Sequence, residues 1–258
     1  MNKEKTEKPF TKLLNIVSQL RGPDGCPWDK EQTHKSLLPY FLEEAYEVIE
    51  GVEAGDMNSL KEELGDVLLH VVFQADIAQK NSEFTIEDSL NYVNEKLVRR
   101  HPHVFGDKKA DAAFHAKQNW ESAKHKEKKR KSRLDGVPET LPALTRAQRL
   151  QEKASYTGFD WENIEQVWGK INEEIQELKE AQTYGIKKHI EEEIGDVIFS
   201  IVNLARFLNI SAEFALRKTN KKFTTRFKAV EDELKNRGKM VEDSNLEEMD
   251  TIWNEVKK

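Results

Sequence analysis

The sequence contains the same acidic pattern twice, and this repeat constrains the fold more than any other feature. Both copies read E-E-x-x-E, then fifteen residues, then E-x-x-D. The first copy runs from Glu43 to Asp66 and the second from Glu173 to Asp196, so the copies lie 130 residues apart. A constant offset over such a long pattern indicates that one structural module has been duplicated.

The residues around both motifs follow helical spacing. Glycine and proline are scarce, at 12 and 7 of 258 residues, and no proline follows Pro142. Apolar stripes of helical period recur along the chain, whereas alternating strand patterns are hard to find. We therefore predict an all-α protein with a loop at residues 22–28. The predicted helices cover residues 10–20, 36–54, 59–80, 85–101, 111–128, 144 onward, 162–184, 187–208, 211–236 and 246–256.

Charge and turn residues divide the chain into two modules. We predict an N-terminal module at residues 1–106, a basic linker or hinge at 107–142 and a C-terminal module at 143–258. The linker contains a lysine-rich run at residues 124–131, followed by Gly136 and Pro138. That run has no interleaved aromatic residues to stack on bases, and the whole chain has a net charge of -6. We therefore expect a solvated hinge and no nucleic-acid partner.

Three features indicate a cytoplasmic protein with no membrane partner. The longest apolar stretch, Val67 to Phe73, is interrupted by His70 and is far shorter than the ~20 residues of a membrane span. Lysine and glutamate dominate the first nine residues, which therefore lack the apolar core of a signal peptide. Cys26 is the only cysteine, which excludes a disulfide scaffold and fits a reducing compartment.

The spacing within each motif places carboxylates on common helix faces. Residues three apart lie on one face, so Glu174 projects with Glu177, and Glu193 with Asp196. A turn of about ten residues around Gly185 would make the two helices antiparallel neighbours. Four carboxylates then converge between them. The corresponding residues of the first copy are Glu44, Glu47, Glu63 and Asp66.

Most glutamates on helices are solvated, but these lie on or beside the apolar stripes. Val67 and Phe73 continue the acidic face in the first copy, and Ile171 and Leu178 flank the acids in the second. Burying unpaired like charges costs several kcal/mol each, so cations must compensate them. Ligand sets made only of oxygen select hard ions, Mg²⁺ first and Mn²⁺ as its substitute. We predict a metal site in each copy.

Together these residues resemble the MazG family of nucleoside triphosphate pyrophosphohydrolases, in its two-domain bacterial form. Both copies match the family's E-E-x-x-E and E-x-x-D motifs, and segments 20–29, 99–105 and 158–161 extend the match to essentially the whole chain. The resemblance implies an all-α fold and homodimers. Because two or three helices per module cannot bury their apolar stripes alone, we expect the modules to form four-helix-like bundles on dimerisation.

The resemblance also implies an activity and its site. It implies Mg²⁺-dependent cleavage of nucleoside triphosphates, with broad base tolerance, to a nucleoside monophosphate and pyrophosphate. The implied role is nucleotide-pool housecleaning, with stress regulation as a further candidate. The implied catalytic residues are Glu173, Glu174, Glu177, Glu193 and Asp196, of which the last four are metal ligands. The residues implied to bind the nucleotide and its phosphates are Lys170, Lys188, His189, Glu192, Lys222, Arg226 and Trp253. His189 departs from the pattern, because a lysine is expected there; Lys188 is its substitute.

Two alternatives remain open. A ferritin-like di-iron bundle would require Glu-x-x-His on two helices, and near the motifs only Glu31 to His34 has that spacing. A nucleotide-binding regulatory protein would have one or both modules without catalysis. We expect the second copy to be the main catalyst. Lys222 and Arg226, four residues apart on one face, suit a polyphosphate, and the first copy has no equivalent of the helix with Trp253.

Overall fold

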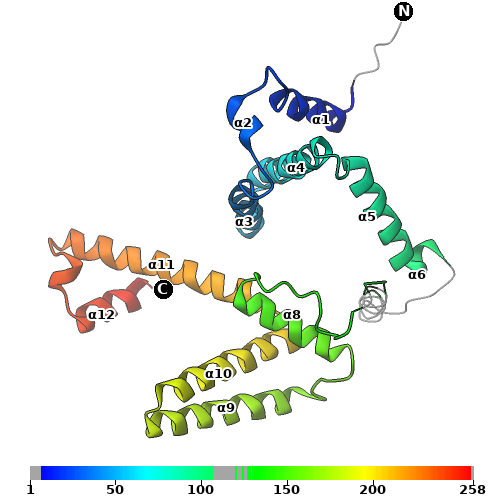
Figure 1. Ribbon diagram of the computed structural model, residues 1–258. Helices are drawn as coiled ribbons and strands as arrows, with labels where there is room; N and C mark the ends of the chain where they lie inside the picture. The colour runs from blue at the N-terminus through cyan, green and yellow to red at the C-terminus, as the bar shows by residue number, and fades with distance from the viewer. Residues whose placement is uncertain (1–6, 107–119, 121–123, 125–126, 129, 257–258) are drawn as a thin grey trace, which may run out of the picture. The chain divides into compact units, whose positions relative to one another are not determined.

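Every regular element that the structure describes is a helix, which confirms the predicted fold class. The structure is a computed structural model that describes residues 7–106, 120, 124, 127, 128 and 130–256 (Figure 1). Its contacts divide the chain into two units, residues 1–111 and 112–258. The helix predicted at residues 111–128 and the first part of the predicted linker fall largely outside the described residues.

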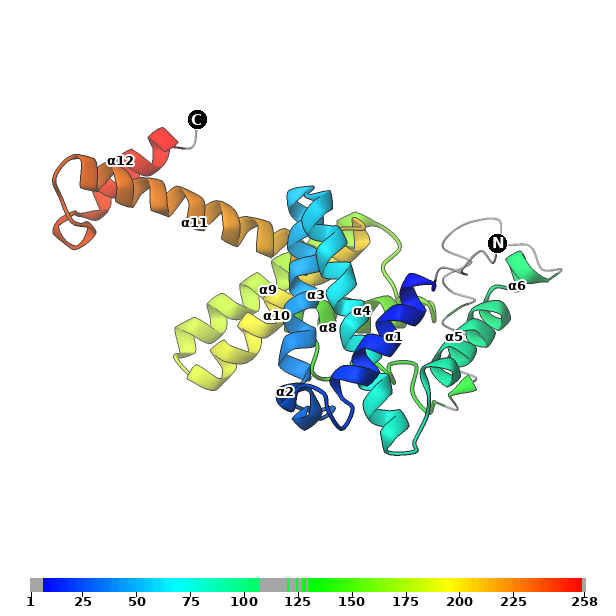
Figure 2. The ribbon, with the colours of Figure 1, turned by 90° about the horizontal axis from the view of Figure 1, so that it is seen from above.

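The N-terminal unit is built around a helical hairpin. Its helices are α1 (Pro9–Leu20), α2 (Pro27–Glu31), α3 (Leu38–Ala54), α4 (Met57–Lys80), α5 (Ile86–Arg100) and α6 (Pro102–Phe105). Helices α3 and α4 pair along their length, and α1 packs on α4 (Figure 2). The stripe predicted on the first helix supplies the core here, since Val17 is fully buried against Leu37, Val72 and Phe73. The hairpin carries the first acidic motif.

The C-terminal unit repeats this hairpin. Its elements are α8 (Ala143–Ser155), α9 (Ile164–Tyr184), α10 (Lys187–Phe207), α11 (Ala212–Asn236), the short η1 (Val241–Asp243) and α12 (Leu246–Val256). Helices α9 and α10 pair as α3 and α4 do, and α8 packs on α10 and α11. Helix α12 folds back onto α11, where Val230, Leu234 and Ile252 form a separate core (Figure 1).

Both hairpins turn over two residues. Gly55 and Gly185 end α3 and α9 with φ of 69° and 71°, a left-handed conformation that glycine adopts without strain. The next helix then begins two residues later, at Met57 or Lys187. The prediction of a turn of about ten residues is therefore wrong, because each glycine reverses the chain at once and both helices extend up to it.

The prediction of a loop at residues 22–28 is wrong at its end, where α2 begins at Pro27. Proline is suited to the first turn of a helix, because its φ is preset and its missing N–H would have no partner there. Helix α6 begins in the same way at Pro102. Pro27 and Pro102 therefore each open a short helix.

Among the described residues, no single helix is long and apolar enough to cross a membrane. Helices α10 and α11 satisfy the length and composition criteria only as a pair, and they meet at a bend of 106°.

Candidate functional site

The C-terminal hairpin brings three of the predicted acids together. Carboxylate oxygens of Glu174 and Glu177 on α9 and of Glu193 on α10 all lie within 4.8 Å of one another. Glu174 is the most buried, at 7% exposure. Burial first, and the charge of Glu174 second, raise the pKa of Glu177 above its usual range. Asp196 is not part of this trio; it is exposed, and it lies at the edge of the adjacent cavity described below.

Lys170 partly neutralises these acids. It lies one turn before them on α9, and its Nζ is 2.8 Å from Glu174 Oε1 and 2.7 Å from Glu173 Oε1. The hydrogen bonds to Glu173 and Glu174 raise the pKa of the Lys170 ammonium group. The ammonium is therefore fixed next to a buried carboxylate, whereas Glu173 points to the outer side of the cluster.

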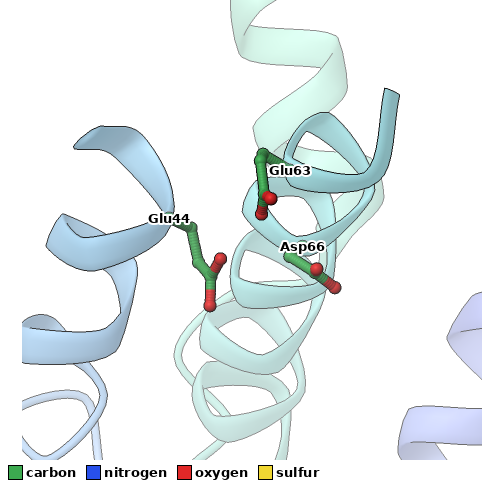
Figure 3. Close-up of side chains that lie close together, drawn as sticks. All are labelled: Glu44, Glu63 and Asp66. Atoms are coloured by element: carbon green, nitrogen blue, oxygen red, sulfur yellow. The ribbon is translucent and has the colours of Figure 1, made fainter. Parts of the chain in front are cut away.

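The N-terminal hairpin forms a matching cluster. Glu44 on α3 faces Glu63 and Asp66 on α4, again with carboxylate oxygens within 4.8 Å of one another (Figure 3). Burial and then the charges of Asp66, Glu47 and Glu63 raise the pKa of Glu44 to about 7. The pKa of Glu63 is raised as well, first by burial and then by Glu47. The cluster therefore repels itself, although Glu47 lies outside the group of three.

A cavity of about 540 Å³ lies beside the C-terminal acids. Glu174 and Asp196 line one part of it, and Phe159 and Trp161, from the segment before α9, line another. Val167 and further apolar side chains line the rest of the cavity. Ligand sites typically combine such an apolar cleft of about 300–1,000 Å³ with a few polar groups. Segment 158–161 carries part of the family resemblance, but its sequence alone does not predict this cavity.

The polar groups of the cavity are few and firmly held. Gln151, with 9% exposure, donates from Nε2 to the Phe199 carbonyl at 2.8 Å. Its Oε1 is buried and has no hydrogen-bond partner within the described part of the chain. Arg206 donates from Nη1 to Asp160 Oδ2 and from Nε to Asn203 Oδ1, both at 2.9 Å. This ion pair holds the segment before α9 against α10.

The N-terminal unit differs at the corresponding positions. At the 130-residue offset, Arg206 corresponds to Asp76, and Asn203 corresponds to Phe73. Asp76 Oδ2 lies 2.8 Å from Arg21 Nε, so this position again carries one half of an ion pair, but with the opposite sign of charge. Phe73 is 5% exposed and belongs to the core. In the N-terminal unit, a core phenylalanine and a carboxylate in a buried ion pair therefore stand at the positions of the cavity-lining Asn203 and Arg206.

The remaining predicted residues lie on α10, α11 and α12. Arg226 on α11 lies over Trp253 of α12, with Cζ 5.9 Å from the ring centroid. Figure 1 shows that α11 carries α12 away from the α9–α10 hairpin, and Lys222 belongs to the same helix as Arg226. The other three, Lys188, His189 and Glu192, are exposed in the first two turns of α10. Lys188 Nζ is 3.7 Å from Glu192 Oε1.

The spacing behind the di-iron alternative does not form one helical face. Glu31 is the last residue of α2, and His34 follows in a turn. His34 is instead hydrogen-bonded to Gln74 of α4.

Comparison with known proteins matches both hairpins to one family. The profile of the MazG nucleotide pyrophosphohydrolase domain matches residues 32–105 and 163–231. The nucleoside triphosphate pyrophosphohydrolase/pyrophosphatase MazG of Thermotoga maritima is 48% identical over 250 residues, covering 96% of this chain and 95% of that protein. The nucleoside triphosphate pyrophosphohydrolase of Escherichia coli K12 is 43% identical over 253 residues, covering 96% of each chain. YabN of Bacillus subtilis is 45% identical over 251 residues, but these are only 51% of its length. Two matched segments, which coincide with the two acidic hairpins, show that the chain belongs to the MazG nucleotide pyrophosphohydrolase family.

Proposed function

We propose that this chain hydrolyses nucleoside triphosphates to a nucleoside monophosphate and pyrophosphate, and that the C-terminal unit does so. One observation carries the proposal: the carboxylates of Glu174, Glu177 and Glu193 converge beside a cavity large enough for a nucleobase. The names of the relatives from Thermotoga maritima and Escherichia coli support the reaction. Phosphoanhydride cleavage needs charge neutralisation and positioning rather than a covalent nucleophile, which fits a site made of acids and a lysine.

The acids fit a hard divalent cation, and we propose Mg²⁺ with Mn²⁺ as its substitute. Glu174, Glu177 and Glu193 offer only oxygen. Burial first, and the charge of Glu174 second, raise the pKa of Glu177, and a bound cation would relieve both effects. Asp196, one turn after Glu193 on α10, would complete the set. A bound ion would act as a Lewis acid on the phosphates and would lower the pKa of a water molecule. Lys170 orients Glu174 and supplies a positive charge for the phosphates, and Glu173 holds Lys170 from the other side.

We propose that the cavity takes the nucleobase. The rings of Phe159 and Trp161 offer stacking surfaces, and the unpartnered Gln151 Oε1 offers a hydrogen-bond acceptor to an amino or imino group. The cavity is larger than any single base, so purines and pyrimidines both fit. The size of the cavity supports broad base tolerance, because an apolar pocket discriminates only weakly between bases of different size.

We further propose a homodimer in which the second copy completes each site. Ile194, Ile198 and Ile201 on α10 are 45%, 49% and 44% exposed, and a two-fold partner would cover them in a four-helix bundle. The partner would then bring Lys222 and Arg226 to the phosphates and Trp253 to the nucleotide. Lys188, His189 and Glu192 lie in the first two turns of α10, next to the turn at Gly185, and we propose that they border the phosphates.

The N-terminal unit receives a supporting role in this proposal. Glu44, Glu47, Glu63 and Asp66 form a second cation site, but Tyr40 stands at the position of Lys170 and Phe73 at that of Asn203. We therefore propose a regulatory, nucleotide-binding role without catalysis for the N-terminal unit alone. For the whole chain we propose housecleaning of the nucleotide pool in the cytoplasm, with stress regulation as a candidate extension.

Product analysis tests the reaction. Each of several nucleoside triphosphates would be incubated with the protein and Mg²⁺, and the phosphorus products followed by NMR. Pyrophosphate and the monophosphate are expected in equal amounts, whereas a diphosphate with orthophosphate would overturn the assignment. Glu193→Gln protein is the control for contaminating enzymes, because it preserves the volume and helix propensity of the side chain.

A further inference from the structure

One wall of the cavity beside the C-terminal acids comes from the segment that precedes α8. Leu134 of this segment lines the cavity together with Leu150 and Ala154 of α8. The Leu134 side chain is 43% exposed, although it belongs to the cavity wall. A ligand in the cavity would therefore cover apolar surface that now contacts solvent, and this burial favours binding.

A buried lysine holds this wall in place. Lys153, in the last turn of α8, is 5% exposed. Its Nζ donates to the Arg133 carbonyl at 3.2 Å and to the Asp135 carbonyl at 3.1 Å. These two carbonyls flank Leu134 in the chain, so the ammonium fixes the backbone on both sides of the cavity-lining residue. A buried ammonium needs such partners because it has lost its hydration, and hydrogen bonds from a charged donor are strong.

The segment around Leu134, which we name loop 130–136, is also braced from within. Asp135 Oδ2 accepts from the backbone N–H groups of Lys131 and Ser132, both at 3.0 Å. The Asp135 N–H in turn donates to the Ser132 carbonyl at 3.2 Å. The loop is therefore a hydrogen-bonded turn, and it presents Leu134 to the cavity in a defined position.

The N-terminal unit has a different residue at the position of the lysine. At the 130-residue offset, Lys153 corresponds to Pro23, whose side chain has no donor. Pro23 lies in the turn after α1, whereas Lys153 lies within α8. The contact between the lysine and the loop is thus a feature of the unit to which the reaction is assigned.

We propose that Leu134 contacts the nucleobase of the substrate and that Lys153 is the positioning residue that holds Leu134 there. The inference rests on the proposed use of the cavity for the nucleobase, and it deepens that proposal by naming what selects the substrate class. A leucine side chain has no hydrogen-bonding group, so it favours every base alike. Inorganic polyphosphate has no apolar surface to bury against it. Leu134 therefore favours nucleotides over inorganic triphosphate, whereas the acids and their cation act on both.

Steady-state kinetics of the full-length protein test the role of Leu134. KM and kcat would be measured with Mg²⁺ and each of ATP, GTP, CTP and UTP. In Leu134→Ala, KM should rise about tenfold for every base while kcat stays within about twofold, because an apolar contact is lost and the acids are unchanged. Val137→Ala is the matched control, since Val137 follows in the same segment without lining the cavity. An unchanged KM in Leu134→Ala, with pyrophosphate still released by wild type, would overturn the inference and leave the proposed reaction intact.

Calorimetry separates binding of the base from binding of the phosphates. Leu134→Ala should raise the dissociation constant of AMP about tenfold and leave that of inorganic tripolyphosphate with Mg²⁺ unchanged. An unchanged constant for AMP, or an equal loss for both ligands, would overturn the contact with the base. The measurement needs no turnover, so it decides on Leu134 even if product analysis overturns the proposed reaction.

A double-mutant cycle tests Lys153. Lys153→Met removes the ammonium and should raise KM about as much as Leu134→Ala does, and the double variant should be no weaker than either single one. Additive losses would overturn the positioning role. Lys131→Met, which removes an exposed ammonium from the same loop, is the control and should leave KM unchanged. If Lys153→Met does not fold, Asp135→Ala releases the turn instead; it should raise KM alike, and an unchanged KM would overturn the role of the loop.

Discussion

Replacing Glu44 by glutamine should stabilise the protein in alkaline solution and not in acid. The pKa of Glu44 is about 7 in the folded state against 4.5 for the free side chain. A folded pKa above the unfolded one means that the folded state holds the proton more tightly, so stability is highest below pH 4.5 and falls as the pH rises to about 7. A shift of this size corresponds to about 3.4 kcal/mol, and solvent screening at this partly exposed carboxyl reduces the expected effect to about 2 kcal/mol.

Urea denaturation followed by circular dichroism measures this difference. In the presence of a chelator, Glu44→Gln should exceed wild type by about 2 kcal/mol at pH 8 and match it at pH 4. Glu50→Gln, an exposed change on the same helix, controls for the general effect of removing one negative charge. Equal stability of wild type and Glu44→Gln at pH 8, or a gain that does not depend on pH, would refute the electrostatic reasoning.

Three other predictions address the site and its assembly. Glu193→Gln should fold as well as wild type but lower the turnover number at least about 100-fold. Glu63→Gln should keep most of the activity. Equal losses in the two variants would contradict the assignment of catalysis to the C-terminal unit. Millimolar Mg²⁺ without nucleotide should raise the melting temperature at neutral pH, and an unchanged value would contradict a preformed cation site. Sedimentation should show a dimer. Mixing the inactive variants Glu193→Gln and Arg226→Met should restore about a quarter of wild-type activity, because half of the dimers would be mixed and each mixed dimer would contain one intact site of two. No recovery would place Arg226 and Glu193 in separate sites.

The two hairpins could be predicted from the sequence because the residue patterns that specify them are local. Helical periodicity, the glycines at positions 55 and 185 and the motif spacing all act within a few turns of helix, and the bounds of α3, α4, α9 and α10 agree with prediction to within two residues. The convergence of Glu174 with Glu193 also follows locally, since a tight reversal forces the two faces together. The estimate of a ten-residue turn was wrong, because the predicted helices, which end at residue 184 and begin again at residue 187, leave only two residues for it.

The cavity and the burial of His70 could not be found in this way. Gln151, Trp161 and Arg206 meet only because α8 packs on α10 and the segment before α9 folds over both. Nothing in the local sequence around Gln151 distinguishes it from an exposed glutamine. His70 stands in the sequence only as an interruption of an apolar stretch, and the burial of its Nδ1, which has no hydrogen-bond partner among the described residues, depends on how α3 packs against α4.

The ion pair between Arg21 and Asp76 also matters for how a duplicated chain folds correctly. Tandem modules of similar sequence risk exchanging equivalent segments while they fold, which is a characteristic failure of repeat proteins. If the segment before the hairpin were exchanged between modules, Arg21 would take the place of Gln151 in the cavity that Arg206 also lines, and Asp76 would lose its arginine partner. Like charges would then come together in the C-terminal unit, and the largely buried carboxylate of Asp76 would be left without Arg21 in the N-terminal unit. Such mismatches cost several kcal/mol, so the polarity of this one pair directs each leading segment to its own hairpin.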